Sequence, residues 1–367
     1  MDAVTLALFA LGLVLLIAGA EALVRGASSI AAMAGISPLV IGLTVVAIGT
    51  SAPELAVSIQ SGIAGQPDLA VGNVVGSNIF NVLFILGISA LVAPLVVSQQ
   101  LVRLDVPIMI GVSALLLAMA LDGRIDRLDG AILGAGFLAY TGFLIRQSRG
   151  ESAAVKAEYE EAFGEDAGLA IARAPLPLQI GLVIAGLAML ILGSRWLVNG
   201  AVTLARALGV SELVIGLTIV AIGTSLPEIA TSIMATIRGE RDIAVGNVVG
   251  SCIFNILGVV GISSLVSPDG LPVQRDLVAI DIPAALLAAF ACLPIFLSGM
   301  IVARWQGALL LGWYAAYTGL LILNSGSNGV LPAYRSVLIV VLLPVTALVL
   351  AVAVARGGRL ARVTPGP

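Results

Sequence analysis

Uncharged runs of about twenty residues recur along the whole chain, separated by short polar breaks. As an α-helix, each run is long enough to cross a hydrocarbon core of about 30 Å. Lipid offers the backbone no hydrogen-bond partners, so a spanning run of this length must be helical. The sequence therefore predicts an all-α, polytopic membrane protein. Eleven runs qualify, at about residues 3–24, 37–61, 69–93, 104–121, 128–146, 178–198, 212–237, 243–267, 277–298, 305–323 and 336–355.

The composition narrows the function further. Of the 367 residues 59% are hydrophobic and 11% are charged, whereas soluble domains carry about 25% charged residues. The chain has no histidine, which excludes His-based zinc sites and Ser-His-Asp hydrolysis. A net charge of −3 gives no sign of the basic surface that nucleic-acid-binding proteins carry. Cys252 and Cys292 both fall inside apolar runs, so no disulfide framework is expected.

The two halves of the chain repeat one another. Residues 37–63 match residues 211–237 at 19 of 27 positions with a constant offset of 174, and residues 69–83 match 243–257 at 12 of 15. The duplicated unit holds five runs, an odd number, so the second copy must enter the membrane from the opposite side. Inverted repeats of this kind are typical of secondary transporters, whose sites lie near the midplane where the repeats meet.

This duplication predicts the domain organisation. We expect a first five-helix repeat over residues 1–147, a connecting loop over 148–177, a second and inverted repeat over 178–324, and an extra helix with a basic tail over 325–367. Under the eleven-helix arrangement, 12 of the 18 Lys and Arg residues fall on one side. Basic residues favour the cytoplasmic side. The chain is thus predicted to lie in the plasma (inner) membrane with its N-terminus outside and with its C-terminus and the connecting loop in the cytoplasm.

Two carboxylates lie inside the apolar runs of the duplicated motif, Glu54 in the second run and Glu228 in the seventh. An ionised group at that depth is costly and marks a functional site by default. Neither half places a basic residue beside them, so protons or transported cations must neutralise them. Inverted repeats are related by a pseudo-two-fold axis in the membrane plane, which would bring the two carboxylates together at the centre. The pair would then supply two negative charges, which match one divalent or two monovalent cations.

Each carboxylate follows a proline, in the segments Gly49–Glu54 (GTSAPE) and Gly223–Glu228 (GTSLPE). Proline has no N–H and breaks the preceding helical turn. We therefore expect the carbonyls from Ala47 to Thr50, and from Ala221 to Thr224, to lose helical partners and to become oxygen ligands. Thr50 and Glu54 are four residues apart and would share a helix face.

The neighbouring runs supply neutral oxygens at helical spacing. Asn73, Ser77 and Asn81 fall at i, i+4 and i+8, and the second half repeats this pattern with Asn247, Ser251 and Asn255. These amides and hydroxyls could instead hold helices together. Combined with the carboxylates and carbonyls, they make the shell of six to eight oxygens that Ca²⁺ prefers. Transition metals would require imidazole or thiolate ligands, which this set lacks.

The paired GTSxPE and GNVVGSxIFN segments resemble the two alpha repeats of the sodium/calcium exchanger family, over about residues 1–324. The resemblance implies ten core helices, alternating-access exchange of Ca²⁺ against Na⁺, and no cofactor. Asn255 stands where some members have Asp, which argues against potassium co-transport. Cys252 replaces the Asn found at position 78 in the first half, and the eleventh helix is additional. The resemblance places ion ligands at Ala47, Thr50, Ser51, Glu54, Ser77, Asn81, Ala221, Thr224, Ser225, Glu228, Ser251 and Asn255.

The sequence is also compatible with other functions. A proton-coupled cation antiporter could use the same scaffold, although a proton would leave the neutral oxygens without a role. An intramembrane enzyme could use the Glu54/Glu228 pair as acid and base, and a passive channel would require weaker ion binding.

Asp105 and Asp281 each precede a proline by two residues and are predicted to cap helices. The oligomeric state is left open.

Overall fold

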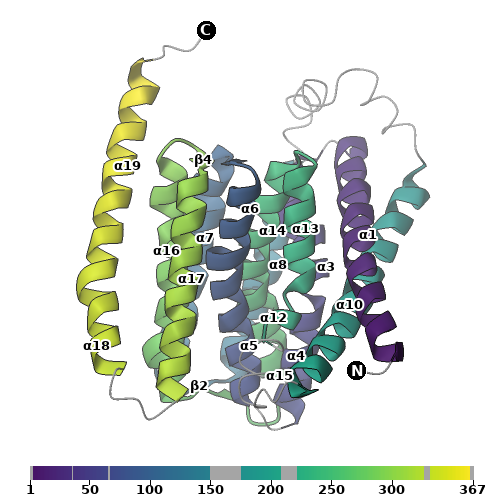
Figure 1. Ribbon diagram of the computed structural model, residues 1–367, viewed down its shortest axis with the longest axis horizontal. Coiled ribbons are helices and arrows are strands. Elements are labelled where there is room, and N and C mark those ends of the chain that lie inside the picture. Colours follow the sequence, from purple (N-terminus) through teal and green to yellow (C-terminus); the bar gives the residue numbers. More distant parts are fainter. Residues whose placement is uncertain are drawn as a thin grey trace.

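The computed structural model describes residues 3–34, 36–64, 67–148, 175–207, 221–325 and 331–363. Most of the predicted connecting loop, 149–174, lies outside the described residues, and so do residues 208–220, which include the first part of the seventh run. Within the described part, nine helices are long and apolar enough to cross a membrane. A tenth crossing is a bent pair, Pro38–Thr50 and Ala52–Ile63. The predicted all-α membrane fold is confirmed (Figure 1).

The first half contains five spans. Three short π-helical segments, η1 (Gly42–Val46), η2 (Asn81–Ile85) and η3 (Leu101–Asp105), are continuous with α-helices. The α-helices are α1 (Ala3–Ala34), α2 (Pro38–Ile41), α3 (Ala47–Thr50), α4 (Ala52–Ile63), α5 (Pro67–Phe80), α6 (Leu86–Val92), α7 (Val106–Ala120) and α8 (Arg127–Ser148).

The second half repeats this order. Its π-helical segments η5 (Asn255–Val260) and η6 (Leu277–Asp281) stand where η2 and η3 stand in the first half. Its α-helices are α10 (Leu176–Ala207), α12 (Ala221–Gly223), α13 (Leu226–Ile237), α14 (Arg241–Phe254), α15 (Gly261–Val266), α16 (Ile282–Leu297) and α17 (Arg304–Ser325). The eleventh run forms α18 (Leu331–Ser336), η7 (Val337–Leu342) and α19 (Leu343–Val363).

The first helices of the two halves run antiparallel, as an inverted repeat requires. A Cβ atom added to Gly12 would lie 2.8 Å from the carbonyl oxygen of Gly193, and one added to Gly19 would lie 2.9 Å from that of Gly186. As residue numbers increase along α1, the residue numbers of its contacts on α10 decrease, so the two helices are antiparallel and their backbones touch. Glycines permit this approach because they carry no side chain. Both helices have 32 residues and extend well beyond the apolar runs predicted for them.

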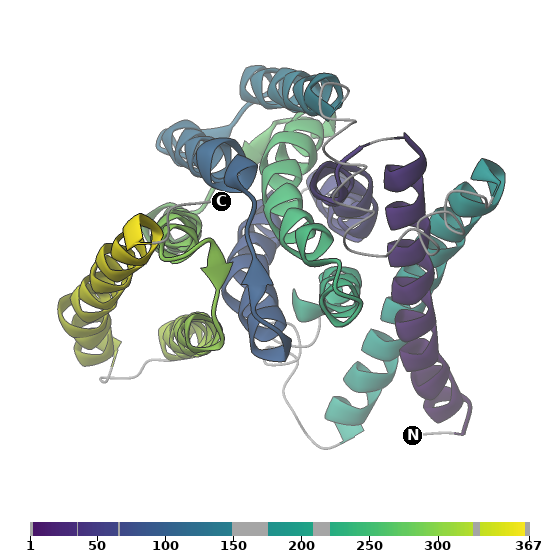
Figure 2. The same ribbon diagram turned by 90° about the horizontal axis from the view of Figure 1, so that it is seen from above.

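Two short antiparallel ribbons join the halves at opposite ends of the bundle (Figure 1). Strand β1 (Leu95–Val96) pairs with β4 (Ile301–Val302), and β2 (Arg124–Ile125) pairs with β3 (Leu271–Pro272). Each ribbon thus takes one strand from each half. Seen from above, α1 and α10 lie at one edge and α19 at the other, with the remaining helices between them (Figure 2).

The most buried spans carry the duplicated motif. Every residue of α14 from Ile243 to Phe254 is buried, and α5 packs against the same core. Lipid-facing helices, by contrast, leave large apolar side chains such as Leu138 and Val340 exposed. The polar residues of α5 and α14 are thereby kept away from lipid, at the centre of the bundle.

Asp105 and Asp281 do not cap helices, and the prediction for them is wrong. Neither side chain makes a capping hydrogen bond, because η3 and η6 continue into α7 and α16 without a break. Instead, Tyr140 donates its hydroxyl to Oδ1 of Asp105 over 2.9 Å, and Tyr317 donates to Oδ1 of Asp281 over 2.7 Å. Each bond ties neighbouring spans of one half together.

Candidate functional site

The second span breaks where the sequence places its proline. Helix α3 ends at Thr50, α4 begins at Ala52, and the two parts of the span are bent by 45°. Pro53 is the second residue of α4, and Pro227 is the second residue of α13. The intervening serines have nearly the same backbone angles, φ −83° and ψ 9° at Ser51 against φ −87° and ψ 9° at Ser225. The described parts of the two breaks therefore have the same local shape.

The two carboxylates meet partners from opposite halves of the chain. Ser51 donates its hydroxyl to Oε1 of Glu228 over 2.8 Å, and Ser225 donates to Oε1 of Glu54 over 2.9 Å. All four side chains are fully buried. The prediction that the halves bring both motifs together is thus confirmed, and each carboxylate is held by a neutral hydroxyl rather than by a basic group.

The serines of α5 and α14 lie at the edge of this cluster. The Ser77 hydroxyl is 3.4 Å from Oε1 of Glu54 and 3.3 Å from the Ser225 hydroxyl. The Ser251 hydroxyl lies 3.5 Å from the carbonyl oxygen of Ala47. These long contacts leave both hydroxyls free to turn toward another partner.

Asn73 and Asn247 link the two halves, which is the alternative role that the sequence analysis left open for them. Thr50 donates to Oδ1 of Asn247 over 3.1 Å, and Thr224 lies 3.5 Å from Oδ1 of Asn73. The amide of Asn73 also donates to the carbonyl of Glu54 over 3.2 Å. Their helical spacing with the neighbouring serines was the only signal for these roles.

The amide groups of α14 and α5 also contact one another. Asn255 donates to Oδ1 of Asn78 over 3.0 Å, and Asn78 donates to the carbonyl of Cys252 over 3.0 Å. Asn78 and Cys252 occupy equivalent positions of the two repeats. Of these two equivalent positions only Asn78 carries an amide, and Cys252 contributes its backbone carbonyl together with a thiol that lies 3.8 Å from the carbonyl oxygen of Asn78.

Several buried polar atoms of this cluster have no hydrogen-bond partner among the described residues. They are Oε2 of Glu54, Oε2 of Glu228, both amide atoms of Asn81, and Oδ1 of Asn255. Buried polar groups nearly always find a partner, so each such atom requires an explanation. Four of the five are oxygens, two of them carboxylate oxygens, which is the donor set that a hard cation would accept.

The carbonyl of Ala47 keeps its helical hydrogen bond, contrary to expectation. Ser51 donates its N–H to this carbonyl over 3.0 Å, because the amide that Pro53 lacks would have bonded Gly49 instead. In the second half, Ser225 donates its N–H to the carbonyl of Ile222 over 3.1 Å. For Ala221 the structure describes the backbone, which begins α12.

The part of the chain that the structure describes holds no group of three or more His, Cys, Asp and Glu side chains around one point. No ion pair in that part reaches Glu54 or Glu228. A cation at this position would therefore be held by two carboxylates and otherwise by neutral oxygens.

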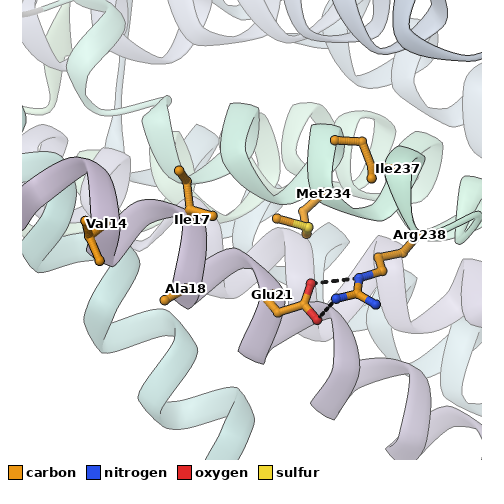
Figure 3. A pocket seen from close by; sticks show the side chains of 7 residues that line it. All are labelled: Val14, Ile17, Ala18, Glu21, Met234, Ile237 and Arg238. Carbon is orange, nitrogen blue, oxygen red and sulfur yellow. Dashed lines mark hydrogen bonds and ion pairs between the residues drawn. The ribbon is translucent and has the colours of Figure 1, made fainter.

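A separate cleft of about 610 Å³ lies between α1 and the end of α13. Figure 3 shows Glu21 of α1 facing Arg238, which follows α13, across this cleft. Arg238 donates from Nε to Oε2 of Glu21 over 2.8 Å and from Nη2 to Oε1. Arg25, one turn further along α1, pairs with the same carboxylate. The remaining lining is apolar, so this cleft does not resemble an ion site.

Comparisons with known proteins agree with one another. A family model described as sodium/calcium exchanger protein matches residues 4–146 and 178–323. The putative antiporter CaxA of Alkalimonas amylolytica is 38% identical over 237 residues, which are 62% of this chain and 70% of that protein. The inner membrane protein YrbG of Escherichia coli is 38% identical over 236 residues, again 62% and 70%.

Two further relatives cover more of the chain. The sodium/calcium exchanger MaX1 of Methanosarcina acetivorans is 32% identical over 297 residues, which are 73% of this chain and 84% of that protein. A solved structure of the sodium-calcium exchanger NCX_Mj, soaked with Na⁺ and Ca²⁺, matches with a TM-score of 0.71 at 31% identity. That match covers 86% of this chain and 97% of the solved one.

Proposed function

Because the chain belongs to the sodium/calcium exchanger family, a family of antiporters and not of enzymes, we propose that it exchanges Ca²⁺ for Na⁺ across the membrane by alternating access. The observation that carries this proposal is the central pair of carboxylates. Each is bonded through Oε1 by a serine of the other half, and each has an Oε2 atom without a partner among the described residues.

The proposed ion ligands are the two carboxylates and the neutral oxygens of the two duplicated motifs. Their oxygens come from carboxylates, hydroxyls, amides and backbone carbonyls, which suits Ca²⁺ at about six to eight ligands and Na⁺ equally. Asn73 and Asn247 orient the threonines without being ligands themselves. The proposed set is Ala47, Thr50, Ser51, Glu54, Ser77, Asn81, Ala221, Thr224, Ser225, Glu228, Ser251 and Asn255.

Charge explains why transport of the two ions would be coupled. An empty site would expose two uncompensated carboxylates to the membrane interior, which is unfavourable. The change between the two faces is then disfavoured until Ca²⁺ or sodium ions fill the site, and a ligand shifts such an equilibrium only through its differential affinity. The inverted halves supply two related conformations between which the site can alternate.

We place the protein in the plasma (inner) membrane, with its N-terminus outside and its C-terminus in the cytoplasm. The excess of basic residues on one side supports this orientation, and a relative from Escherichia coli is named as an inner membrane protein. The two inverted repeats would then span residues 1–147 and 178–324. The 148–177 loop and the tail that follows the last helix, within residues 325–367, would face the cytoplasm.

Flux of radioactive calcium into proteoliposomes tests the proposal. An outward Na⁺ gradient at equal pH should drive Ca²⁺ into the vesicles, whereas an equal K⁺ gradient should not. Removing K⁺ from both sides should leave the flux unchanged. Ca²⁺ uptake that follows a pH gradient in Na⁺-free buffer would instead establish a proton-coupled antiporter on the same scaffold.

A further inference from the structure

A second cleft lies between the C-terminal helix and the second half, and none of the proposed ion ligands lines it. This space, here called the α19 cavity, has a volume of about 400 Å³ and is lined mainly by the span η6–α16, by α17 and by the continuous helix α18–η7–α19, with Leu83 of η2. Most of its lining is apolar. The exceptions are Trp313, Tyr317, Arg335 and Thr346. In Figure 1, α19 stands at the edge of the bundle beside α16 and α17.

Three hydrogen bonds hold the C-terminal helix against α17 and thereby keep the α19 cavity open. Tyr334 donates to the carbonyl of Ala316 over 2.8 Å, Arg335 donates to Oδ1 of Asn324 over 2.8 Å, and Trp313 donates to Thr346 over 3.0 Å. These bonds fix the distance between the helices. The apolar side chains of α16 and α19 face the space between them without filling it.

The position of the cavity determines the chemistry of its occupant. All three helices that line it are long and apolar enough to span a membrane. Two of its lining residues, Leu287 and Ile339, are 52% and 65% exposed, so the cavity opens on the surface that faces lipid. Water gains little from an apolar wall. A hydrocarbon chain from the bilayer is the species available to enter.

Arg335 gives the cavity a charged end. Among the described residues it is the one charged member of the lining, and no carboxylate there pairs with it. Arg335 lies close to the beginning of the last span, Leu331–Ala355. Leu350, the lining residue farthest from it along this helix, follows fifteen residues later, which is about 22 Å. One leaflet of hydrocarbon is about 15 Å deep. The apolar wall that begins at Arg335 is therefore long enough for an acyl chain.

We propose that the α19 cavity binds an anionic phospholipid, with one acyl chain between α16 and α19 and the phosphate held by Arg335. A guanidinium pairs well with phosphate because its planar donors match two phosphate oxygens. Asn324 would keep the guanidinium in place. This site belongs to the second half, where the eleventh helix packs, and it does not depend on which ions the central site carries.

Tryptophan fluorescence can detect the bound lipid directly. The chain has three tryptophans, and Trp313 lines the cavity. In the full-length chain carrying Trp196→Phe and Trp305→Phe, Trp313 would be the sole emitter. We expect brominated phosphatidylglycerol, diluted in phosphatidylcholine, to quench Trp313 as if its mole fraction beside this residue were about fivefold higher than in the bulk membrane. The reason is that one arginine attracts an anionic lipid to about this extent. Brominated phosphatidylcholine should show no such preference.

Four variants make this test specific. Arg335→Gln should abolish the preference for phosphatidylglycerol, whereas Arg335→Lys should retain part of it. Arg304→Gln is the matched control, because Arg304 begins α17 at its other end and does not line the cavity. Ala284→Leu, which adds bulk to the cavity wall, should reduce quenching by either lipid.

Three results would overturn the proposal. They are equal quenching by the two brominated lipids in the parent chain, a preference that persists in Arg335→Gln, and an absence of quenching at Trp313. A loss of preference in Arg304→Gln equal to that in Arg335→Gln would also count against it, because the effect would then reflect general surface charge.

Discussion

The hydroxyl oxygen of Ser51 lies 2.8 Å from Oε1 of Glu228, a residue 177 positions away in the other half of the chain. The reciprocal bond, from Ser225 to Glu54, measures 2.9 Å. Neither half alone could hold its own carboxylate in this way. The duplicated motif thus becomes a single site only when the two inverted halves pack together.

Neutralising either central carboxylate should abolish Ca²⁺ transport. Glu54→Gln and Glu228→Gln keep the shape of the side chain and remove half of the charge that offsets a divalent cation. We expect each variant to fold and insert normally, and to show almost no calcium flux in proteoliposomes. Asp122→Asn, at an exposed carboxylate, is the control. Flux above about half of the wild-type value in either glutamine variant would contradict the two-carboxylate site.

Removing the serine hydroxyls should weaken Ca²⁺ binding symmetrically. A hydrogen bond to a charged group contributes about 1.5–3 kcal/mol, so Ser51→Ala and Ser225→Ala should each raise the KM for Ca²⁺ at least about tenfold. Ser113→Ala should leave the KM unchanged, because the one partner of that buried hydroxyl among the described residues is the carbonyl of Met109 in its own helix. An unchanged KM in both site variants would show that these bonds do not shape the site.

Asn247 should act as a positioning residue. Its side chain accepts from Thr50 over 3.1 Å and donates to Ser232 over 2.9 Å. Asn247→Ala would leave both hydroxyls without these partners and would loosen a proposed ligand. We expect the KM for Ca²⁺ to rise and the ratio of Ca²⁺ to Sr²⁺ transport to change, since selectivity depends on ligand geometry.

Asn199→Ala provides the control for this prediction, because Asn199 is exposed on α10. If Asn247→Ala lowered only the amount of folded protein and left the KM and the ion preference as in the wild type, Asn247 would have a purely structural role.

Close contact between α1 and α10 should depend on glycine. At Gly19 an added Cβ would lie 2.9 Å from the carbonyl of Gly186, whereas at Gly134 it would meet no atom within 4 Å. Overpacking of this kind costs about 1–3 kcal/mol. Gly19→Ala should therefore lower the melting temperature in detergent. Gly134→Ala should give a melting temperature equal to or above that of the wild type, because alanine favours the helix more than glycine does. Equal melting temperatures would show that the helices separate without cost.

The predicted orientation can be checked with single cysteines in a chain that carries Cys252→Ser and Cys292→Ser. Ala64→Cys, next to Gly65, should react with an impermeant reagent from outside. A cysteine in the 150–170 segment, which lies outside the described residues, should react from the cytoplasm. Labelling of both from the same side would contradict the proposed orientation.

The sequence alone was enough to predict the helical spans, the duplication and the buried carboxylates. Each of these follows from patterns that are local along the chain or that compare one segment with another. A run of twenty apolar residues forms a helix in lipid whatever surrounds it, since the backbone has no other partner. An odd number of spans per repeat likewise inverts the second copy regardless of how its helices pack.

Only the tertiary structure decided which groups became partners. The bonds from Ser51 to Glu228 and from Thr50 to Asn247 cross between halves, and no spacing along the chain predicts them. Asp105 bonds Tyr140 instead of capping α7, because the continuous helix left no free amides and α8 brought a hydroxyl close. The α19 cavity likewise depends on where the last helix docks. Hydrogen bonds and cavities depend on distances of a few ångströms between distant segments, which packing alone determines.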